Sequence, residues 1–248
     1  MAIQFDGSSG THILCGSEAS IDDIFVGGGA VCGWVKIDTT VANDNQQIFG
    51  KGVLGVDGTH IYVVTTALEV RLWNEMTNDG NWASPDNSIT TGVWKHVAVT
   101  YNATTVAPNF FIDGTSQTVT TIFAPTGINV SDAGSTIEFG SLTDAVAANV
   151  STWLLEGSLE DWRMYDSILT NAQIATLAAG YRDALGGEVA WFTFEDADGV
   201  TVWDGVSVST GSAIIPDKSV NSNTGTPQGT GMTYRASAAP RMAGYIHE

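Results

Sequence analysis

The stretch WKHVAVTYN at residues 94–102 constrains the fold strongly because its residues alternate strictly. Val97 and Val99 fall on one side of the alternation, and His96 and Ala98 fall on the other. A period of two is that of a β-strand, in which successive side chains point to opposite faces. We therefore expect Val97 and Val99 to face a core that lies between two sheets.

Similar short runs recur along the chain, and turn residues separate them. Asp-Gly pairs at 57–58, 79–80 and 113–114 stand where hairpin turns are expected, because Asp and Gly readily adopt positive φ. The expected strands are residues 11–15, 30–37, 47–51, 60–65, 68–73, 95–101, 109–112, 136–139, 158–165 and 188–194. This pattern predicts an all-β fold, an antiparallel sandwich of two sheets.

One short segment has the pattern of a helix instead. Thr170 can cap its first turn, and Gln173 stands three residues on, as in a capping box. Ile174 and Leu177 then follow at helical spacing. The sequence predicts one helix over residues 170–184, directly after the strand at 158–165.

The length of 248 residues and the 43% of hydrophobic residues suit one large all-β domain with a full core. Past residue 185 the composition changes, and residues 205–240 are rich in Gly, Ser, Thr, Asn and Pro. We predict a domain over 1–185 and a C-terminal strand and arm over 186–248 that packs on it. The predicted core contains Trp34, Phe49, Val97, Val99, Phe111, Phe139, Leu159 and Trp162.

The charge is strongly acidic. Lys and Arg number 9 while Asp and Glu number 27, which gives a net charge of −18. Such a surface repels nucleic-acid phosphates and anionic membranes, so neither is an expected partner. The carboxylates either serve solubility alone or bind cations such as calcium.

The two cysteines, Cys15 and Cys32, are too few for a disulfide scaffold. Buried free thiols are favoured, and a single disulfide between adjacent strands remains open. The opening MAIQFDGSSGTHI lacks the basic and apolar segments of a signal peptide. Either a signal has been removed, or the protein leaves its cell by another route such as lysis.

An ordered series of phrases resembles the laminin-G-like, pentraxin-like branch of the concanavalin A-like jelly-roll sandwiches. The phrases are FDGSS at 5–9, VCGWVKI at 31–37, IFGKG at 48–52, WKHVAVTYN at 94–102, FFIDGT at 110–115, IEFGS at 137–141 and the stretch from 157, which opens with GSLEDWRMYD, through Gly180. The resemblance implies a jelly roll with one short helix after the last family strand, packed against the sandwich.

The resemblance also implies a metal site. In pentraxin-like proteins calcium is held by an Asp-Asn pair in an early loop and by a Gln-Glu-Gln-Asp run after a later strand. Asp57 matches the first aspartate, but Gly58 replaces the asparagine. Asp144 matches the later aspartate, while Leu142 replaces the glutamate. We expect a weak calcium site at Asp57 and Asp144, completed by the carbonyl of Thr143 and by water, with turn-forming and solvated roles for both carboxylates as the alternative.

The tail carries a second resemblance to the same family. EVAWFTFEDADG at 188–199 and PDKSVNSNTGT at 216–226 are similar to the phrase that normally precedes the first strand. A truncated second copy and an arm that folds back along the sandwich are both compatible with this. Oxygen-bearing residues alternate from Asp217 to Asn223, which favours a set of Asx turns over a calcium loop, because no acidic residue closes the loop.

Catalytic patterns are absent from the sequence. Related hydrolases place paired carboxylates on one strand, and the nearest approach here is the adjacent pair Glu160 and Asp161, which we expect to point to opposite faces. We therefore predict no catalytic residues and no enzyme activity. Trp73 and Trp82 flank the Asp-Gly turn at 79–80 and are candidate glycan-binding residues, because an exposed indole can stack on a sugar. Half-buried structural roles for both are the alternative.

These expectations favour a non-catalytic, lectin-like structural or attachment module on the surface of a virus particle, such as a bacteriophage head-decoration or tail protein. The alternatives are a secreted glycan-binding lectin and, less favoured, a glycan hydrolase. The expected partners are other virion proteins or surface glycans, with a homo-oligomer as a further option. The expected location is the virion surface or the extracellular space.

Overall fold

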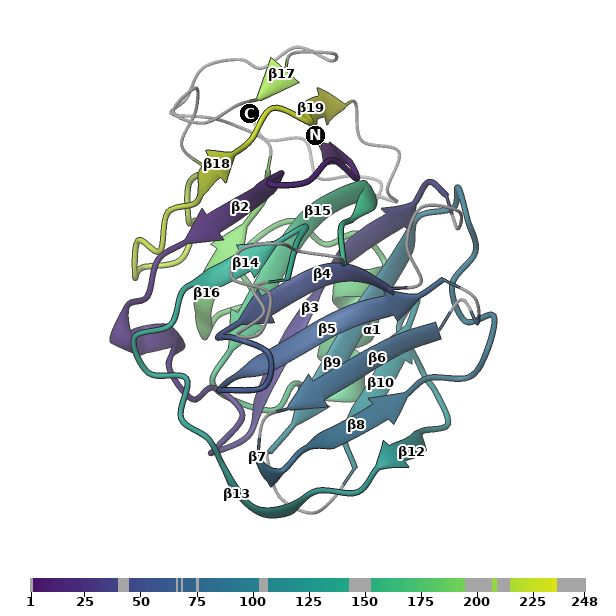
Figure 1. Ribbon diagram of the computed structural model, residues 1–248, viewed down its shortest axis with the longest axis vertical. Coiled ribbons are helices and arrows are strands. Elements are labelled where there is room, and N and C mark those ends of the chain that lie inside the picture. The colour runs from purple at the N-terminus through teal and green to yellow at the C-terminus, as the bar shows by residue number, and fades with distance from the viewer. Residues whose placement is uncertain are drawn as a thin grey trace.

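The computed structural model describes residues 2–39, 45–65, 67, 69–74, 76–102, 107–142, 153–194, 207–208 and 215–235. Within these residues the chain forms two antiparallel sheets packed face to face, with a short helix outside one of them (Figure 1). The predicted all-β sandwich of the jelly-roll type is confirmed. No helix in the described ranges is both long and apolar enough to cross a membrane.

Sheet A is the layer that carries the helix on its outer face. Its strands among the described residues run in the order β11-β10-β9-β3-β15-β1-β19-β17, and β16 also pairs with β15. Their bounds are β1 Ala2–Asp6, β3 Gly29–Ile37, β9 Lys95–Tyr101, β10 Asn109–Ile112, β11 Thr115–Ser116, β15 Glu156–Tyr165, β16 Glu188–Phe192, β17 Ser207–Val208 and β19 Met232–Arg235.

Sheet B is the second layer, turned toward the viewer in Figure 1. Its described strands run in the order β12-β8-β6-β5-β4-β14-β2-β18. Their bounds are β2 His12–Cys15, β4 Asn45–Lys51, β5 Thr59–Val64, β6 Glu69–Asn74, β8 Gly80–Ala83, β12 Thr120–Phe123, β14 Ile137–Phe139 and β18 Thr226–Gln228. A separate two-stranded ribbon joins β7 Met76–Asn78 to β13 Thr126–Asn129, and a 3₁₀ turn η1 spans Ala19–Ile21.

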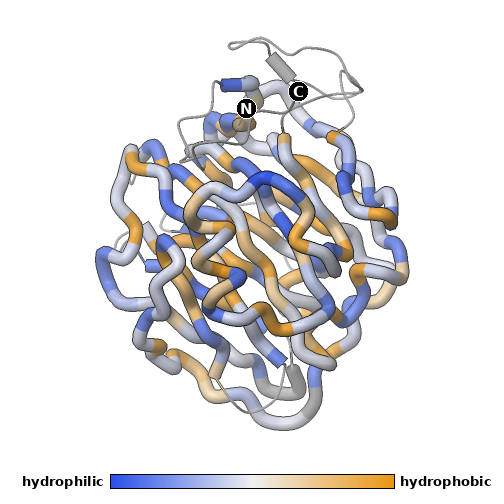
Figure 2. The backbone as a smooth tube through the Cα atoms, turned by 180° about the vertical axis from the view of Figure 1, so that it is seen from behind, coloured by the Kyte–Doolittle hydropathy of each residue, from blue (hydrophilic) through white to orange (hydrophobic). Residues whose placement is uncertain are grey.

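The core between the sheets follows from alternation along the strands, where hydrophobic and hydrophilic residues succeed one another (Figure 2). All eight residues of the predicted core are buried, including Val97 and Val99. Trp34 and Phe111, however, point away from the space between the sheets. Trp34 contacts the His96 ring at 5.4 Å, and Phe111 packs beneath the helix residue Ile174. The sequence therefore predicted correctly that Trp34 and Phe111 are buried, but not the face of the sheet on which they lie, because that depends on strand register.

The helix α1, Asn171–Ala178, covers the outer face of sheet A. The predicted capping box is present: the Gln173 backbone N–H donates to Thr170 Oγ1, and the Gln173 side chain accepts from the Thr170 N–H. The helix ends earlier than the predicted residue 184. Gly180 adopts a φ of +93°, the left-handed conformation that commonly terminates helices.

The C-terminal segment is continuous with both sheets. Strand β19 pairs with β1 beside the N-terminus, and β18 pairs with β2 (Figure 1). Buried residues of the segment, including Phe192 and Tyr234, join the main core. The described part of the tail therefore folds back along the sandwich.

Both cysteines are free and buried. Cys15 lies in the core between the sheets, whereas Cys32 lies on the outer face of sheet A beneath the helix. Burial raises the pKa of both thiols, that of Cys32 to about 12. The open question of one disulfide is thereby resolved in favour of two thiols.

Candidate functional site

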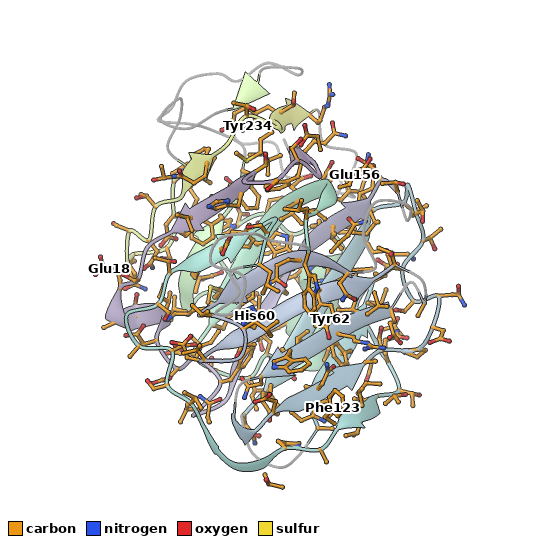
Figure 3. The ribbon with its side chains drawn as sticks, in the orientation of Figure 1. Glu18, His60, Tyr62, Phe123, Glu156 and Tyr234 are labelled. Atoms are coloured by element: carbon orange, nitrogen blue, oxygen red, sulfur yellow. The ribbon has the colours of Figure 1, made fainter. Side chains whose placement is uncertain are left out.

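The outer face of sheet B carries polar and aromatic side chains on adjacent strands. In β5, Ile61 and Val63 face the core, so His60 and Tyr62 face outward. Figure 3 shows these two side chains on the face of the sheet turned toward the viewer. The same alternation in β6 turns Arg71 and Trp73 outward.

Four side chains of this face form a continuous line across the sheet, which we call the outer row: Glu138, His60, Trp73 and Asn81. Gly50 lies between Glu138 and His60. Along this line each residue lies directly opposite the next one on the adjacent strand. Glu138 is 7% exposed, and His60 and Asn81 are each 1% exposed, whereas Trp73 is half-buried. Polar residues are thus buried on the outside of the sandwich.

Gly50 makes the space for one polar contact of the row. A Cβ on Gly50 would lie 2.5 Å from Gln47 Nε2 and 2.9 Å from His60 Nδ1. Gln47 Nε2 donates to the Phe49 carbonyl at 2.7 Å and lies 3.2 Å from His60 Nδ1. Nδ1 therefore accepts, and the neutral ring carries its proton on Nε2. Burial lowers the pKa of His60 to about 3, so the ring is neutral at pH 7.

The neighbouring side chains form a second polar group beside the row. Asn81 Nδ2 donates to the Tyr62 hydroxyl at 3.0 Å. Arg71 Nε donates to Glu69 Oε1 at 2.6 Å, so the two charges compensate each other. Burial raises the pKa of Tyr62, which keeps its hydroxyl protonated.

Several buried polar atoms of this face have no hydrogen-bond partner within the described part of the chain. They are Gln47 Oε1, His60 Nε2, Trp73 Nε1 and Asn81 Oδ1. Each such atom costs about 1–3 kcal/mol when it is left unpaired away from water. The four atoms lie on neighbouring residues: His60 Nε2 and Trp73 Nε1 can donate hydrogen bonds, and Gln47 Oε1 and Asn81 Oδ1 can accept them.

Aromatic rings flank these polar atoms. Trp153 lies over Tyr62 with ring centroids 4.6 Å apart, and Trp73 meets Phe123 edge-on at 6.0 Å. Phe123 is 55% exposed, and Trp153 and Trp73 are half-buried. The face therefore combines partly exposed apolar rings with hydrogen-bonding groups.

A pocket of about 280 Å³ lies at the Glu138 end of the outer row. Its walls come from the β4–β5 turn and from the segment that leads into β14. The lining residues are Gly52, Val53, Gly134, Ser135, Thr136 and Glu138. Glu138 accepts a hydrogen bond from Ser141 Oγ and thus presents a fixed carboxylate to this pocket.

The two tryptophans predicted to bind glycans lie on opposite faces of sheet B. Trp73 opposes Asn81, whereas Trp82 opposes Leu72, one residue out of phase. Trp82 is 1% exposed and packs on Tyr101 at 5.0 Å. Trp82 therefore belongs to the core and offers no free ring to a sugar, and the ligand role of Trp73 stays a prediction.

Asp57, the part of the predicted calcium site that the structure describes, is engaged in hydrogen bonds within the protein. Asp57 Oδ1 accepts from the Val53 N–H at 2.7 Å, and Oδ2 accepts from Ser135 Oγ at 3.1 Å. The turn that contains Asp57 adjoins the start of β14, while Leu142 follows its other end. No cluster of three or more His, Cys, Asp or Glu suited to a metal occurs among the described residues.

Thr143 and Asp144 lie outside the described residues, so the calcium assignment stays a prediction. The other oxygen-rich segment is in the tail, where both oxygens of Asp217 accept hydrogen bonds from nearby groups. Asp217 Oδ1 accepts from the Trp191 and Ser219 N–H groups, and Oδ2 accepts from the Asn223 N–H, all at 2.8 Å. Asp217 thus fastens a turn onto β16.

The carboxylates nearest to a catalytic pair are both neutralised by arginine. Glu160 and Asp161 were expected on opposite faces, but a β-bulge in β15, with Asp161 at a φ of +53°, brings both to Arg182, each 3.1 Å from it. Arg163 adds two bonds to Asp161 at 3.1 and 3.2 Å. Both carboxylates are at least 95% buried in this network, being 0% and 5% exposed.

Sequence reasoning missed most of the outer row, including His60, Asn81 and Glu138. The alternation in THIYVV and EVRLWN does carry their outward orientation. The alternation does not show that these outward side chains are buried, because the side chains that cover this face, such as Trp153, come from distant parts of the chain.

Comparison with known proteins identifies the family to which this fold belongs. Residues 9–175 match the laminin-G family model of the concanavalin A-like lectin/glucanases superfamily. No curated protein sequence matches the chain. A Bacteroides ovatus protein, for which carbohydrate binding has been suggested, aligns with 95% of this chain at 16% identity and a TM-score of 0.61. This chain spans 60% of that protein.

Two further structures share the fold at low identity. A heptameric SAP-like pentraxin from Limulus polyphemus aligns over 71% of this chain and 81% of its own at 20% identity, with a TM-score of 0.52. The CBM40 of the Ruminococcus gnavus IT-sialidase, solved with α2,3 sialyllactose, aligns over 69% and 97% at 14% identity, with a TM-score of 0.51. The fold and the match to the family model confirm the resemblance drawn from the sequence, and the chain belongs to the concanavalin A-like lectin/glucanase superfamily.

Proposed function

We propose that the protein is a non-catalytic carbohydrate-binding module that holds a glycan on the outer face of sheet B. The observation that carries this proposal is the group of four adjacent buried polar atoms without partners in the described chain, at Gln47, His60, Trp73 and Asn81. Sugar hydroxyls both donate and accept, so one ligand class satisfies all four. The flanking rings of Trp73 and Trp153 supply the apolar surface on which a sugar ring stacks.

The experiment is a glycan array followed by calorimetric titration of the intact chain. Trp73→Ala removes both a stacking surface and a donor, and we expect it to weaken binding about tenfold or more. Trp94→Ala is the matched control, because Trp94 is also half-buried but immediately precedes β9 in sheet A. Circular dichroism checks that both variants fold. Equal affinities for the two variants contradict the proposal.

The non-catalytic part of the proposal is supported by the arginine pairing of Glu160 and Asp161. A glycosidase needs a proton-donating acid and a free carboxylate on either side of a bond. We expect no new reducing ends when the protein is incubated with the glycans that it binds. Release of reducing sugar that is lost in Glu160→Gln contradicts this part.

The attachment role on a virus particle rests on the sequence, and glycan binding at the outer face is compatible with it. Mass spectrometry of purified particles tests that role directly. Recovery of the chain at stoichiometric amounts supports it, while its recovery in the soluble secreted fraction alone favours the free lectin.

A further inference from the structure

We infer that the outer row binds an uncharged sugar and discriminates against acidic ones. This inference rests on the proposed glycan-binding function and adds the chemical class of the ligand. The juxtaposition that carries it is two amide oxygens beside two N–H donors, none of which has a partner among the described residues. They lie on residues that are directly opposed or in contact across the sheet.

The hydrogen-bonding roles of the four atoms are fixed by their neighbours. The amide nitrogen of Gln47 donates to the Phe49 carbonyl and to His60 Nδ1, which leaves Oε1 as an acceptor without a partner among the described residues. Asn81 likewise gives its nitrogen to Tyr62, so Oδ1 remains an acceptor. His60 Nε2 and Trp73 Nε1 are donors.

A ligand must therefore both donate and accept at this face. A hydroxyl group does both, and neighbouring hydroxyls on one sugar ring offer the required pairs. A carboxylate, sulfate or phosphate only accepts, so it leaves Gln47 Oε1 and Asn81 Oδ1 unpaired. An unpaired buried acceptor facing an anion is unfavourable in itself.

The charges around the row point the same way. Arg71, a cation beside the row, is paired with Glu69 at 2.6 Å. Its charge is therefore already compensated when an anionic ligand approaches. Glu138 places a carboxylate at the end of the row, and the whole chain carries a charge of −18.

The row is long enough to contact more than one sugar unit. From Gly50 in β4 to Asn81 in β8 it crosses three strand spacings, about 14 Å in all at about 4.8 Å each. The pocket of about 280 Å³ continues beyond Gly50. A carboxylate such as that of Glu138 can accept hydrogen bonds from ligand hydroxyls but repels an anion, which again favours a neutral ligand.

The test is a titration series with matched oligosaccharides. Each neutral oligosaccharide that binds the intact chain is compared with the same compound capped by sialic acid, and with its sulfated form. We expect each acidic form to bind about tenfold more weakly, because its anionic group cannot donate to Gln47 Oε1 or Asn81 Oδ1 and approaches a chain of charge −18. Equal or tighter binding of the acidic forms overturns the inference while leaving glycan binding itself intact.

Two variants keep the outcome tied to this face. Trp73→Phe retains a ring but lacks the N–H, and we expect affinity for the neutral sugar to fall about threefold to tenfold. Trp94→Phe, outside the outer row, is the matched control with unchanged affinity. Neutral-sugar binding that Trp73→Phe leaves unchanged overturns the assignment to the row, and no glycan binding at all overturns the proposed function with it.

Discussion

At the scale of single residues, His60 and His96 are buried on the outer faces of the two sheets. Burial lowers the pKa of His60 to about 3 and that of His96 to about 4. In the unfolded chain both histidines have an ordinary pKa of about 6.5. Below about pH 6.5 both histidines bind a proton in the unfolded chain but stay neutral in the folded protein. The free energy of unfolding therefore falls as the pH decreases.

We predict that the free energy of unfolding falls by about 1.4 kcal/mol for each histidine between about pH 7.5 and about pH 5.5. Urea unfolding at the two pH values measures this. His60→Gln and His96→Gln should each remove about half of the pH dependence. The same dependence in both variants would mean that other groups cause it.

Asp57 is the second residue with a directly testable role. We predict that millimolar calcium raises the melting temperature if the site shared with Asp144 exists, because a ligand bound to the folded state stabilises it. Asp57→Ala and Asp144→Ala should abolish the shift. Asp57→Ala should also cost about 1–2 kcal/mol without calcium, since it removes two hydrogen bonds of a turn. No calcium shift in the wild type eliminates the metal site.

At the scale of elements, the bulge in β15 gathers a buried ionic network around Arg163. Its guanidinium bonds to Asp161 and to the carbonyls of Tyr181 and Asp183, and it stacks on Trp191 at 4.2 Å. The network fastens the segment after α1 to sheet A.

We predict that Arg163→Met destabilises the protein by about 3–5 kcal/mol, because it leaves Asp161 and two carbonyls without this donor. The control is Lys95→Met, which breaks the more exposed pair between Lys95 and Asp113 and should cost about 0–1 kcal/mol. Denaturant unfolding measures both. Equal losses would show that the network adds nothing beyond a surface ion pair.

At the scale of the whole molecule, the C-terminal strands complete the sandwich. Phe192 is fully buried and meets Phe139 of sheet B at 5.6 Å. We predict that Phe192→Ala costs about 3–5 kcal/mol, while Val220→Ala at a 94% exposed position changes stability by about 0.5 kcal/mol or less.

The same docking predicts a single cooperative transition for the chain. Far-ultraviolet circular dichroism and tryptophan fluorescence should give coincident unfolding curves. An early transition confined to one probe would show that residues 186–248 unfold separately from the sandwich.

Much of the secondary structure of this protein could be predicted from local signals in the sequence. Alternation predicted most of the longer strands and the inward face of Val97 and Val99, although it did not predict β1 and β8. The capping box of Thr170 and Gln173 predicted the start of the helix. These features depend on residues within a few positions of one another, so no knowledge of the fold is needed to read them.

Tertiary structure determined most of the candidate site. The register between β6 and β8 put Trp73 outside and Trp82 inside, and the bulge at Asp161 turned two adjacent carboxylates to one face. The outer row exists because β14, β4, β5, β6 and β8 pair in that order. Strand pairing and burial depend on residues that are far apart in the chain, and a pattern with a period of two is the same in every register.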